Sequence, residues 1–344
     1  MLTLCLAPRT SAQQPASVPA ARVTQAIAEA RSPALTADGF KQLLALAYEL
    51  SAENRYAEAA ELFGALVEQR PREPAALYGA ALATFNTGHA ADAEPLAQRA
   101  ADLALEAARA ATSDAAHERK LRAADALVLL GVIQAVRGDN GAALKTVAQA
   151  VALAPDNFDA QFALGRALFG ADDDAGAARA FRAALALRPQ DAQARFFLAT
   201  VLEHAGDDEG ALAAYRELVK QEPRAAEGHL GLGVLLVKRN GAEAEEGLQE
   251  LTRALEIKPD LYEARAALGR ALVARGRAAE AIEHLRRAAE LAPGNPEPHY
   301  QLSLAYRRLG RNAEAAAEST IVQHIHAARR SAGAENKPPS KPED

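Results

Sequence analysis

Five regularly spaced prolines place the tightest constraint on how this chain can fold. They are Pro155, Pro189, Pro223, Pro259 and Pro293, and successive members are 34, 34, 36 and 34 residues apart. The same arrangement of small and bulky apolar residues precedes each proline. A fixed period of this size indicates an array of structural repeats rather than a conventional globular domain.

Each repeat has the pattern of two short amphipathic helices. In the copy that ends at Pro189, apolar residues recur every three to four positions, first around Phe162 and again around Phe181. Gly165 and Ala177 lie where the two helices cross, and their small size permits close approach of the helix axes. Proline cannot continue a helix, so Pro189 ends the second one. The pattern therefore predicts a helical hairpin repeated along the chain.

This pattern resembles the tetratricopeptide repeat (TPR), a helix-turn-helix unit of 34 residues. The resemblance implies an all-α fold, a right-handed superhelical solenoid of about eight TPR-like repeats. We expect the solenoid to span residues 36–330. Its repeats are predicted near residues 40–73, 74–111, 112–157, 158–191, 192–225, 226–261, 262–295 and 296–329.

The segments outside the solenoid have a different composition. Residues 1–20 are predicted to be a leader or a disordered segment, and 21–35 a short helix and linker. Thr36 is predicted to be the N-cap of the first solenoid helix. Ser319 replaces a large apolar residue and indicates an end cap, and residues 331–344 are predicted to be a disordered tail.

The start of the chain leaves two compartments open. Residues 2–7 are a short apolar run, followed by small residues at 10–12 that resemble a cleavage site. If residues 1–12 are the remnant of a signal peptide, the protein is exported or periplasmic; otherwise it is cytoplasmic. Cys5 is the only cysteine, which excludes an intramolecular disulfide, and no run of about 20 apolar residues indicates a membrane span.

The second repeat lacks its closing proline. Its second helix is therefore expected to run on towards Ala111, and residues 115–136 are expected to form one long helix after a turn at 112–114. The resulting extension, residues 101–122, is either a tolerated insertion or a dedicated binding feature.

The sequence has no recognisable catalytic, cofactor or metal motif. The eight histidines have no partner at a recognisable ligand spacing and are interpreted as surface residues. The Asp172–Asp174 run lacks the alternation of a calcium loop and is interpreted as a helix-capping turn. A net charge of −6, spread along the chain, argues against a nucleic-acid partner. We therefore expect a protein that is not an enzyme and has no cofactor.

The resemblance also predicts a binding surface. In the family, the second, fifth, ninth, twelfth and thirteenth positions of each repeat face the inner groove, and these positions follow one helix face. The implied groove residues here are Tyr48, Tyr78, Phe85, Phe162, Arg166, Phe169, Phe196, Glu203, His204, Lys238, Glu263, Arg270, Tyr300, Arg307 and Arg308. Aromatic side chains on such a face either form a binding site or pad the contact between adjacent first helices.

The groove residues favour one mode of binding over another. The Lys and Asn residues with which one branch of the family grips a C-terminal carboxylate are absent, since Val128 and Val132, for example, occupy those positions. We expect a non-catalytic scaffold that binds an extended or helical protein segment, with Arg166 and Arg270 as candidates for pairing with carboxylates. The alternatives are a structural assembly component, or a regulatory or substrate-docking subunit of a larger complex.

Overall fold

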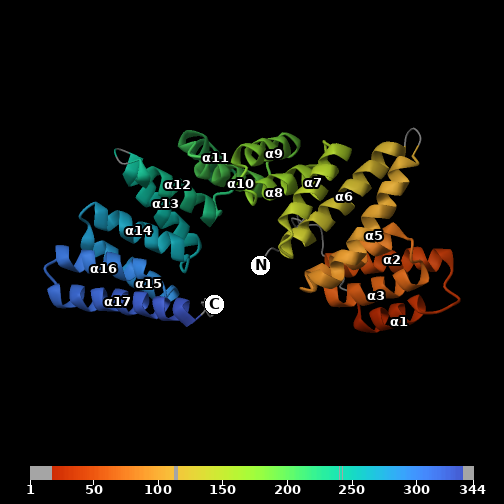
Figure 1. Cartoon of the computed structure of the whole chain (residues 1–344), viewed down its shortest axis with the longest axis horizontal. Helices are drawn as coiled ribbons and strands as arrows, with labels where there is room; N and C mark the ends of the chain where they lie inside the picture. The colour runs from red at the N-terminus through yellow and green to blue at the C-terminus, as the bar shows by residue number, and fades with distance from the viewer. Residues whose placement is uncertain (1–17, 112–114, 240, 242, 336–344) are drawn as a thin grey trace, which may run out of the picture. The chain divides into compact units, whose positions relative to one another are not determined.

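The computed structural model describes residues 18–111, 115–239, 241 and 243–335, and all regular secondary structure in these residues is α-helical. The predicted fold class, an all-α solenoid of helix-pair repeats, is confirmed. The helices within the described residues are shown in Figure 1: α1 (Ala20–Ala30), α2 (Ala37–Ala52), α3 (Tyr56–Gln69), α4 (Pro74–Asn86), α5 (Ala90–Arg109), α6 (Ala115–Val136), α7 (Asn140–Leu153), α8 (Phe158–Phe169), α9 (Asp174–Leu187), α10 (Ala192–His204), α11 (Asp208–Gln221), α12 (Ala226–Lys238), α13 (Glu243–Ile257), α14 (Tyr262–Ala274), α15 (Ala278–Leu291), α16 (Pro296–Arg308) and α17 (Asn312–Glu335).

Consecutive helices from α2 onward pack as pairs, α2 with α3 through to α16 with α17. The chain divides after Pro189 into two compact units. The first unit contains α1–α9, and α1 packs on α3 through Val23, Ala26 and Ala30. The second unit contains α10–α17. In both units the first helix of a pair contacts its own partner and the first helix of the next pair within that unit, as expected for stacked repeats.

Small residues let the paired helices approach closely. A Cβ atom added at Gly165 would lie only 2.8 Å from Phe181 Cε1, and one added at Gly131 only 2.4 Å from Val147 Cγ2. Both distances are shorter than any tolerable contact between carbon atoms. In each pair the bulky side chain therefore occupies the space that a side chain at the glycine would need. The expectation that Gly165 marks a close helix crossing is confirmed.

Side-chain caps begin many of the helices. Thr36 accepts a hydrogen bond from the Gly39 backbone N–H at 3.1 Å, as predicted. Asp173 accepts one from the Gly176 N–H at 2.8 Å, so the Asp172–Asp174 run does contain a helix cap. Asp207 does the same for Gly210, and these carboxylates also complement the positive end of the helix that follows.

The absence of a closing proline in the second repeat has the predicted consequence. The two longest helices of the first unit are adjacent, α5 with 20 residues and α6 with 22, and they pack along one another. The turn and N-cap expected at residues 112–114 lie outside the described residues. The nine residues of α6 that precede Ala124 have no counterpart in the regular repeats.

The predicted tail boundary needs a correction. The final helix, α17, continues to Glu335, so residues 331–335 are helical rather than part of a disordered tail. The first proline of the tail is Pro338, and helix propagation past Arg330 meets no residue that would stop it. Residues 336–344 lie outside the described part of the chain, as do residues 1–17.

Candidate functional site

Six of the predicted groove residues line three pockets: Tyr48, Tyr78, Phe162, Arg166, Lys238 and Arg270. The most apolar of these is in the first unit, between α6, α7 and α8, and is called the α6–α8 pocket here; its volume is about 280 Å³. Its lining from α6 and α8 comes from groove positions of two consecutive repeats: Val128, Val132, Ala135 and Val136 on α6, and Asp159, Phe162, Arg166 and Gly170 on α8 and just after it.

Helical spacing brings the valines into this pocket. Val128, Val132 and Val136 are four residues apart, so they form one apolar ridge along α6. The floor between the helices includes Gly131 and Val147, the pair whose close contact is described above. Val136 at the C-terminal end of the ridge remains 48 % exposed, although it is a large apolar residue. The pocket therefore presents apolar surface to solvent.

Phe162 and Arg166 form the α8 side of the pocket. The ring of Phe162 stacks on Phe158 at 5.9 Å and meets the edge of Phe181 at 5.6 Å. Phe162 thus both lines the pocket and packs within its own repeat. Burial lowers the pKa of Arg166, but a guanidinium remains charged at neutral pH, so the pocket has a cation at its edge.

A second pocket, of about 730 Å³, lies between α2, α4, α5 and α6. Tyr48 and Tyr78 line it on one side. The Tyr48 hydroxyl donates to the Ala75 carbonyl at 2.8 Å, and burial, with a smaller effect from Glu73, raises the pKa of Tyr48 to about 12. Arg119 and Arg122, from the extra residues of α6, form part of the opposite wall. The helix extension therefore contributes directly to this pocket.

The third pocket lies in the second unit, between α12 and α14, with a volume of about 230 Å³. It is lined by Lys238 and Arg270, among others, at positions that correspond to Val136 and Arg166 three repeats earlier. Lys238 forms an ion pair with Asp208, with the Nζ and Oδ2 atoms 3.1 Å apart, and Arg270 is exposed. This equivalent position is more polar than the α6–α8 pocket.

The other predicted groove residues have different environments. Phe85 is only 9 % exposed and lies in the hydrophobic core of the first unit with Ala81, Ala93 and Ala97. Phe196 packs against Phe197 and Tyr215, which belong to its own repeat, and Phe169 is half-buried. The Tyr215 hydroxyl donates to Glu203 at 3.2 Å, and burial raises the pKa of that carboxyl group.

The remaining predicted residues are exposed. His204 ends α10, Glu263 lies in the first turn of α14, and Tyr300 is 50 % exposed on α16. Arg307 donates to the hydroxyl of Ser319, and Arg308 to the carbonyl of Val273. The predicted groove set is therefore divided among three pockets, one core and several exposed positions.

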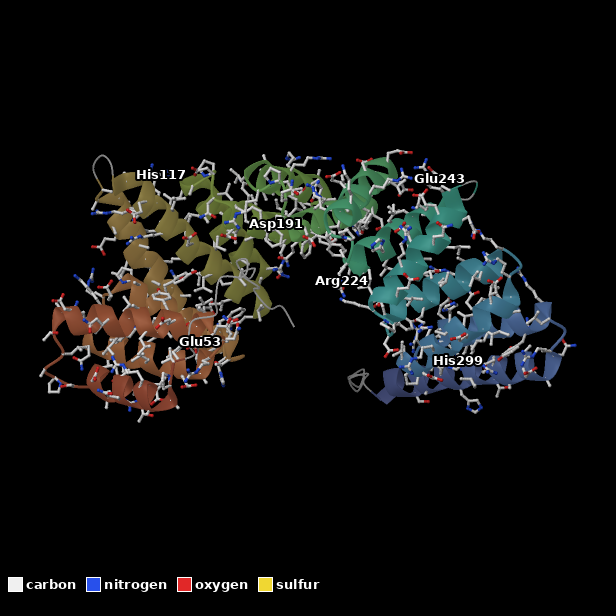
Figure 2. The ribbon with its side chains drawn as sticks, turned by 180° about the vertical axis from the view of Figure 1, so that it is seen from behind. Glu53, His117, Asp191, Arg224, Glu243 and His299 are labelled. Atoms are coloured by element: carbon white, nitrogen blue, oxygen red, sulfur yellow. The ribbon has the colours of Figure 1, made fainter. Side chains whose placement is uncertain are left out.

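The interpretation of the histidines as surface residues is wrong for His229. This side chain is buried between α12 and α13, where Nδ1 lies 2.5 Å from Glu250 Oε2. His299, which is labelled in Figure 2, makes the same kind of contact two repeats later. Its Nδ1 atom lies 2.6 Å from Glu318 Oε2. Both histidines are the fourth residue of their repeats. This shared position is the sequence signal that could have indicated the same structural role for both side chains. Each site has one histidine and one carboxylate, and Glu250 also accepts from Arg253 at 2.7 Å. The described residues contain no group of three or more potential metal ligands.

Comparison with protein-family models identifies the repeats. A model described as tetratricopeptide repeat matches residues 44–104, 137–190, 162–221 and 209–262, and a model described as TPR repeat matches residues 269–310. Together these matches cover more than half of the chain. No curated protein matches the sequence.

Solved structures with a similar fold include the APC/C hetero-tetramer Cut9–Hcn1. That structure has a TM-score of 0.53 and 14% identity, over 88% of this chain and 56% of that one. The structure of the MamA protein has a TM-score of 0.46 and 20% identity, over 54% of this chain and 98% of that one. YrrB, described as a TPR protein with an unusual peptide-binding site, has a TM-score of 0.45 and 20% identity, over 52% of this chain and 91% of that one.

Among the helices of the described residues, none is both long enough and apolar enough to cross a membrane.

Proposed function

Because this chain belongs to the tetratricopeptide repeat family, we propose that it is a non-catalytic protein-interaction scaffold that binds an extended or helical segment of a partner protein. The segment lies against the groove positions of the first helices. The α6–α8 pocket receives an apolar side chain of the partner and is the main anchor of the interaction.

The exposure of Val136 at the rim of the α6–α8 pocket is the observation that carries this proposal. A pocket of about 280 Å³ lined by four valines has room for one or two aliphatic or aromatic side chains. Burial of an apolar side chain contributes about 1.5–3 kcal/mol, and such anchors dominate the energetics of protein interfaces. The apolar ridge of α6 therefore supplies affinity.

The charges around the pocket favour one kind of segment. Arg166 and Asp159 line the pocket, and Arg188, outside the lining, lies 3.7 Å from Asp159 and partly offsets its negative charge. A partner segment with a carboxylate beside its apolar anchor matches this surface better than a basic segment does.

The experiment compares two aspartate variants of the first unit. Peptides are selected from a displayed random library with the full chain, and their affinities are then measured with Val136→Asp and Leu187→Asp. Val136 is 48 % exposed in the pocket and Leu187 is 40 % exposed at the end of α9, away from the pocket lining. Both changes place one carboxylate at an exposed apolar position, so neither is expected to disturb folding.

We expect Val136→Asp to weaken binding of the selected peptides at least tenfold, because the new carboxylate loses solvation when an apolar side chain covers it. Leu187→Asp should bind within about twofold of the unchanged protein, because it lies outside the anchor. Selected peptides that bind Val136→Asp as tightly as the unchanged chain would exclude the α6–α8 pocket as the anchor.

A further inference from the structure

Four arginines surround a pocket of about 520 Å³ in the second unit, and none of its lining residues is one of the predicted groove residues. Arg265 comes from α14, Arg286 and Arg287 from α15, and Arg311 from the connection between α16 and α17. Ala279 and Ile282 add apolar surface, and Glu283 and Glu290 complete the lining. This site is called the arginine pocket.

Within the described residues, Arg265 and Arg286 hydrogen-bond to neutral groups rather than to carboxylates. The Nε atom of Arg265 donates to the Pro259 carbonyl at 2.9 Å, and the Nε atom of Arg286 donates to the Tyr306 hydroxyl at 3.0 Å. Neither guanidinium forms an ion pair with any carboxylate in the part of the chain that the structure describes. The two guanidinium groups therefore line one pocket without a direct carboxylate contact, although Glu283 and Glu290 share the lining and the charge of Arg286 reaches Glu314.

The contacts of these two arginines hold them in place without neutralising them. Tyr306 is 1 % exposed, so its ring and hydroxyl form a rigid support, and the Arg286 guanidinium lies 5.9 Å from the ring centroid. The Pro259 carbonyl is a backbone group with a fixed position. Because these contacts use the Nε atoms of both side chains, the two Nη atoms of Arg286 remain for an additional acceptor.

Arg287 and Arg311 have a different role because both are already ion-paired. Arg287 contacts Asp260 at 2.8 Å and Glu290 at 2.9 Å. The Nε atom of Arg311 donates to Glu314 at 2.7 Å. These pairs form a charged rim, whereas Arg265 and Arg286 are the two arginines of the pocket that make no direct ion pair with a carboxylate of the described residues.

We infer that the arginine pocket binds an acidic segment of a partner protein, with a Glu or Asp side chain of that segment contacting the guanidinium groups of Arg265 and Arg286. The two pinned arginines provide charge-assisted donors, and Arg–carboxylate contacts of this kind are among the stronger hydrogen bonds in proteins. Ile282 provides apolar surface for the flanking residues of the segment. This site is independent of the α6–α8 pocket and serves a second contact.

The lining favours a protein carboxylate over a nucleic acid. Glu283 and Glu290 repel a string of phosphates, but they accept hydrogen bonds from the backbone amides that flank a single carboxylate. The chain as a whole has a net charge of −6, which opposes binding of a polyanion at long range. A segment in which acidic and apolar residues alternate fits the pocket, because its carboxylates meet the arginines and its apolar side chains meet Ile282.

The test uses the full chain and a capped peptide of alternating glutamate and leucine, six residues long, with binding measured by calorimetry at low ionic strength. We expect Arg265→Gln and Arg286→Gln each to weaken peptide binding about tenfold, since each loses one charge-assisted contact. Arg224→Gln removes the same charge from an exposed position outside the pocket (Figure 2) and should change binding less than twofold.

Two further measurements separate binding from any effect on folding. The same peptide with glutamine in place of glutamate should no longer bind the unchanged protein. This comparison needs no substitution in the chain, so folding cannot affect it. The His284 Nδ1 atom lies 3.4 Å from Arg265 Nη1, and burial together with Arg265 lowers the pKa of His284. A carboxylate bound at Arg265 offsets that positive charge, so the peptide should raise the pKa of His284 as followed by NMR.

Several results would overturn the inference. They are equal binding of the glutamate and glutamine peptides, equal binding by the unchanged protein and Arg286→Gln, and no detectable binding at about 1 mM peptide. Tighter binding of a single-stranded oligonucleotide than of the glutamate peptide would assign the pocket to nucleic acid instead.

Discussion

The Nδ1 atom of His229 lies 2.5 Å from the Oε2 atom of Glu250, and the two side chains are only 6 % and 7 % exposed. The Nε2 atom of the same ring lies 3.1 Å from the Pro223 carbonyl, which accepts hydrogen bonds and donates none. Nε2 must therefore carry a hydrogen, and the short contact on the other side of the ring also requires a proton between His229 and Glu250. This buried pair connects α12 and α13 with the end of the preceding repeat.

Breaking the His229–Glu250 pair should be strongly destabilising. Glu250→Ala leaves the imidazole buried without its partner, and we expect it to lower the free energy of unfolding by about 3–5 kcal/mol. Glu318→Ala is the matched control, because its partner His299 and Glu318 itself are 13 % and 17 % exposed and solvent replaces the lost contact. Its cost should be about 1 kcal/mol. Urea unfolding followed by circular dichroism measures both, and equal losses would contradict a special role for burial.

Enlarging Gly165 should overpack the contact between α8 and α9. The Cβ atom of Gly165→Val would lie within 3 Å of the Phe181 ring, and we expect a loss of about 1–3 kcal/mol. Gly64→Ala is the control, since a Cβ atom there meets nothing within 4 Å. Gly64 lies inside α3, so alanine should stabilise the chain by about 0.5–1 kcal/mol. Thermal denaturation distinguishes the two, and a neutral Gly165→Val would show that the helices separate freely.

Asp125 should make stability depend on pH. Burial raises the pKa of its carboxyl group, the charge of Asp159 adds to this effect, and the hydrogen bond from Asn157 opposes it. A carboxyl group whose pKa is raised on folding favours the folded state below its unfolded pKa of about 4, and this contribution is lost as the pH rises through the folded value.

Asp125→Asn should therefore stabilise the chain at pH 7, because the amide avoids burial of a charge and its oxygen still accepts from Asn157. The gain should shrink towards zero at pH 3, where the native carboxyl group is protonated as well. Asp102→Asn, at an exposed position on α5, provides the comparison. Unfolding titrations at the two pH values test this expectation, and a gain that grows on acidification would reverse the assigned sign.

Removing the last helix pair should expose the core of the second unit. Leu302, Ala305 and Tyr306 of α16 are buried against the cluster that contains Leu272 and Leu285. Deletion of residues 296–344 uncovers that surface, so we expect aggregation at concentrations where the full chain stays dispersed. Deletion of residues 336–344 alone should have no such effect. Size-exclusion chromatography of both truncations measures the difference, and a dispersed, equally stable product of the larger deletion would place the cap elsewhere.

Much of the local structure could be predicted from the sequence because it depends on neighbours in the chain. The spacing of the prolines indicated the helix pairs, Gly165 indicated a close crossing, and Thr36 indicated a cap. The missing proline of the second repeat indicated the long helices α5 and α6. Each of these features follows from helix geometry within one repeat.

The groove was only partly predictable for the opposite reason. The position rule placed Phe162 and Arg166 at a pocket but also included Phe85, which fills the space left by Ala93 and Ala97 in the core. The same rule, applied to the third repeat, includes Val136, but only the exposure of this side chain in the folded structure shows that the ridge remains uncovered. Whether a groove position is open depends on the volumes of side chains from other helices.

What the sequence determined by itself is the repeat: its period, its two helices and its small residues, all set by contacts within about 34 positions of the chain. Tertiary structure alone decided which charges have partners. Glu250 pairs with His229, whereas Arg265 and Arg286 meet a backbone carbonyl and a hydroxyl instead of a carboxylate. Coulombic interaction and burial depend on distance in space, and residues from different helices acquire those distances only when the repeats stack.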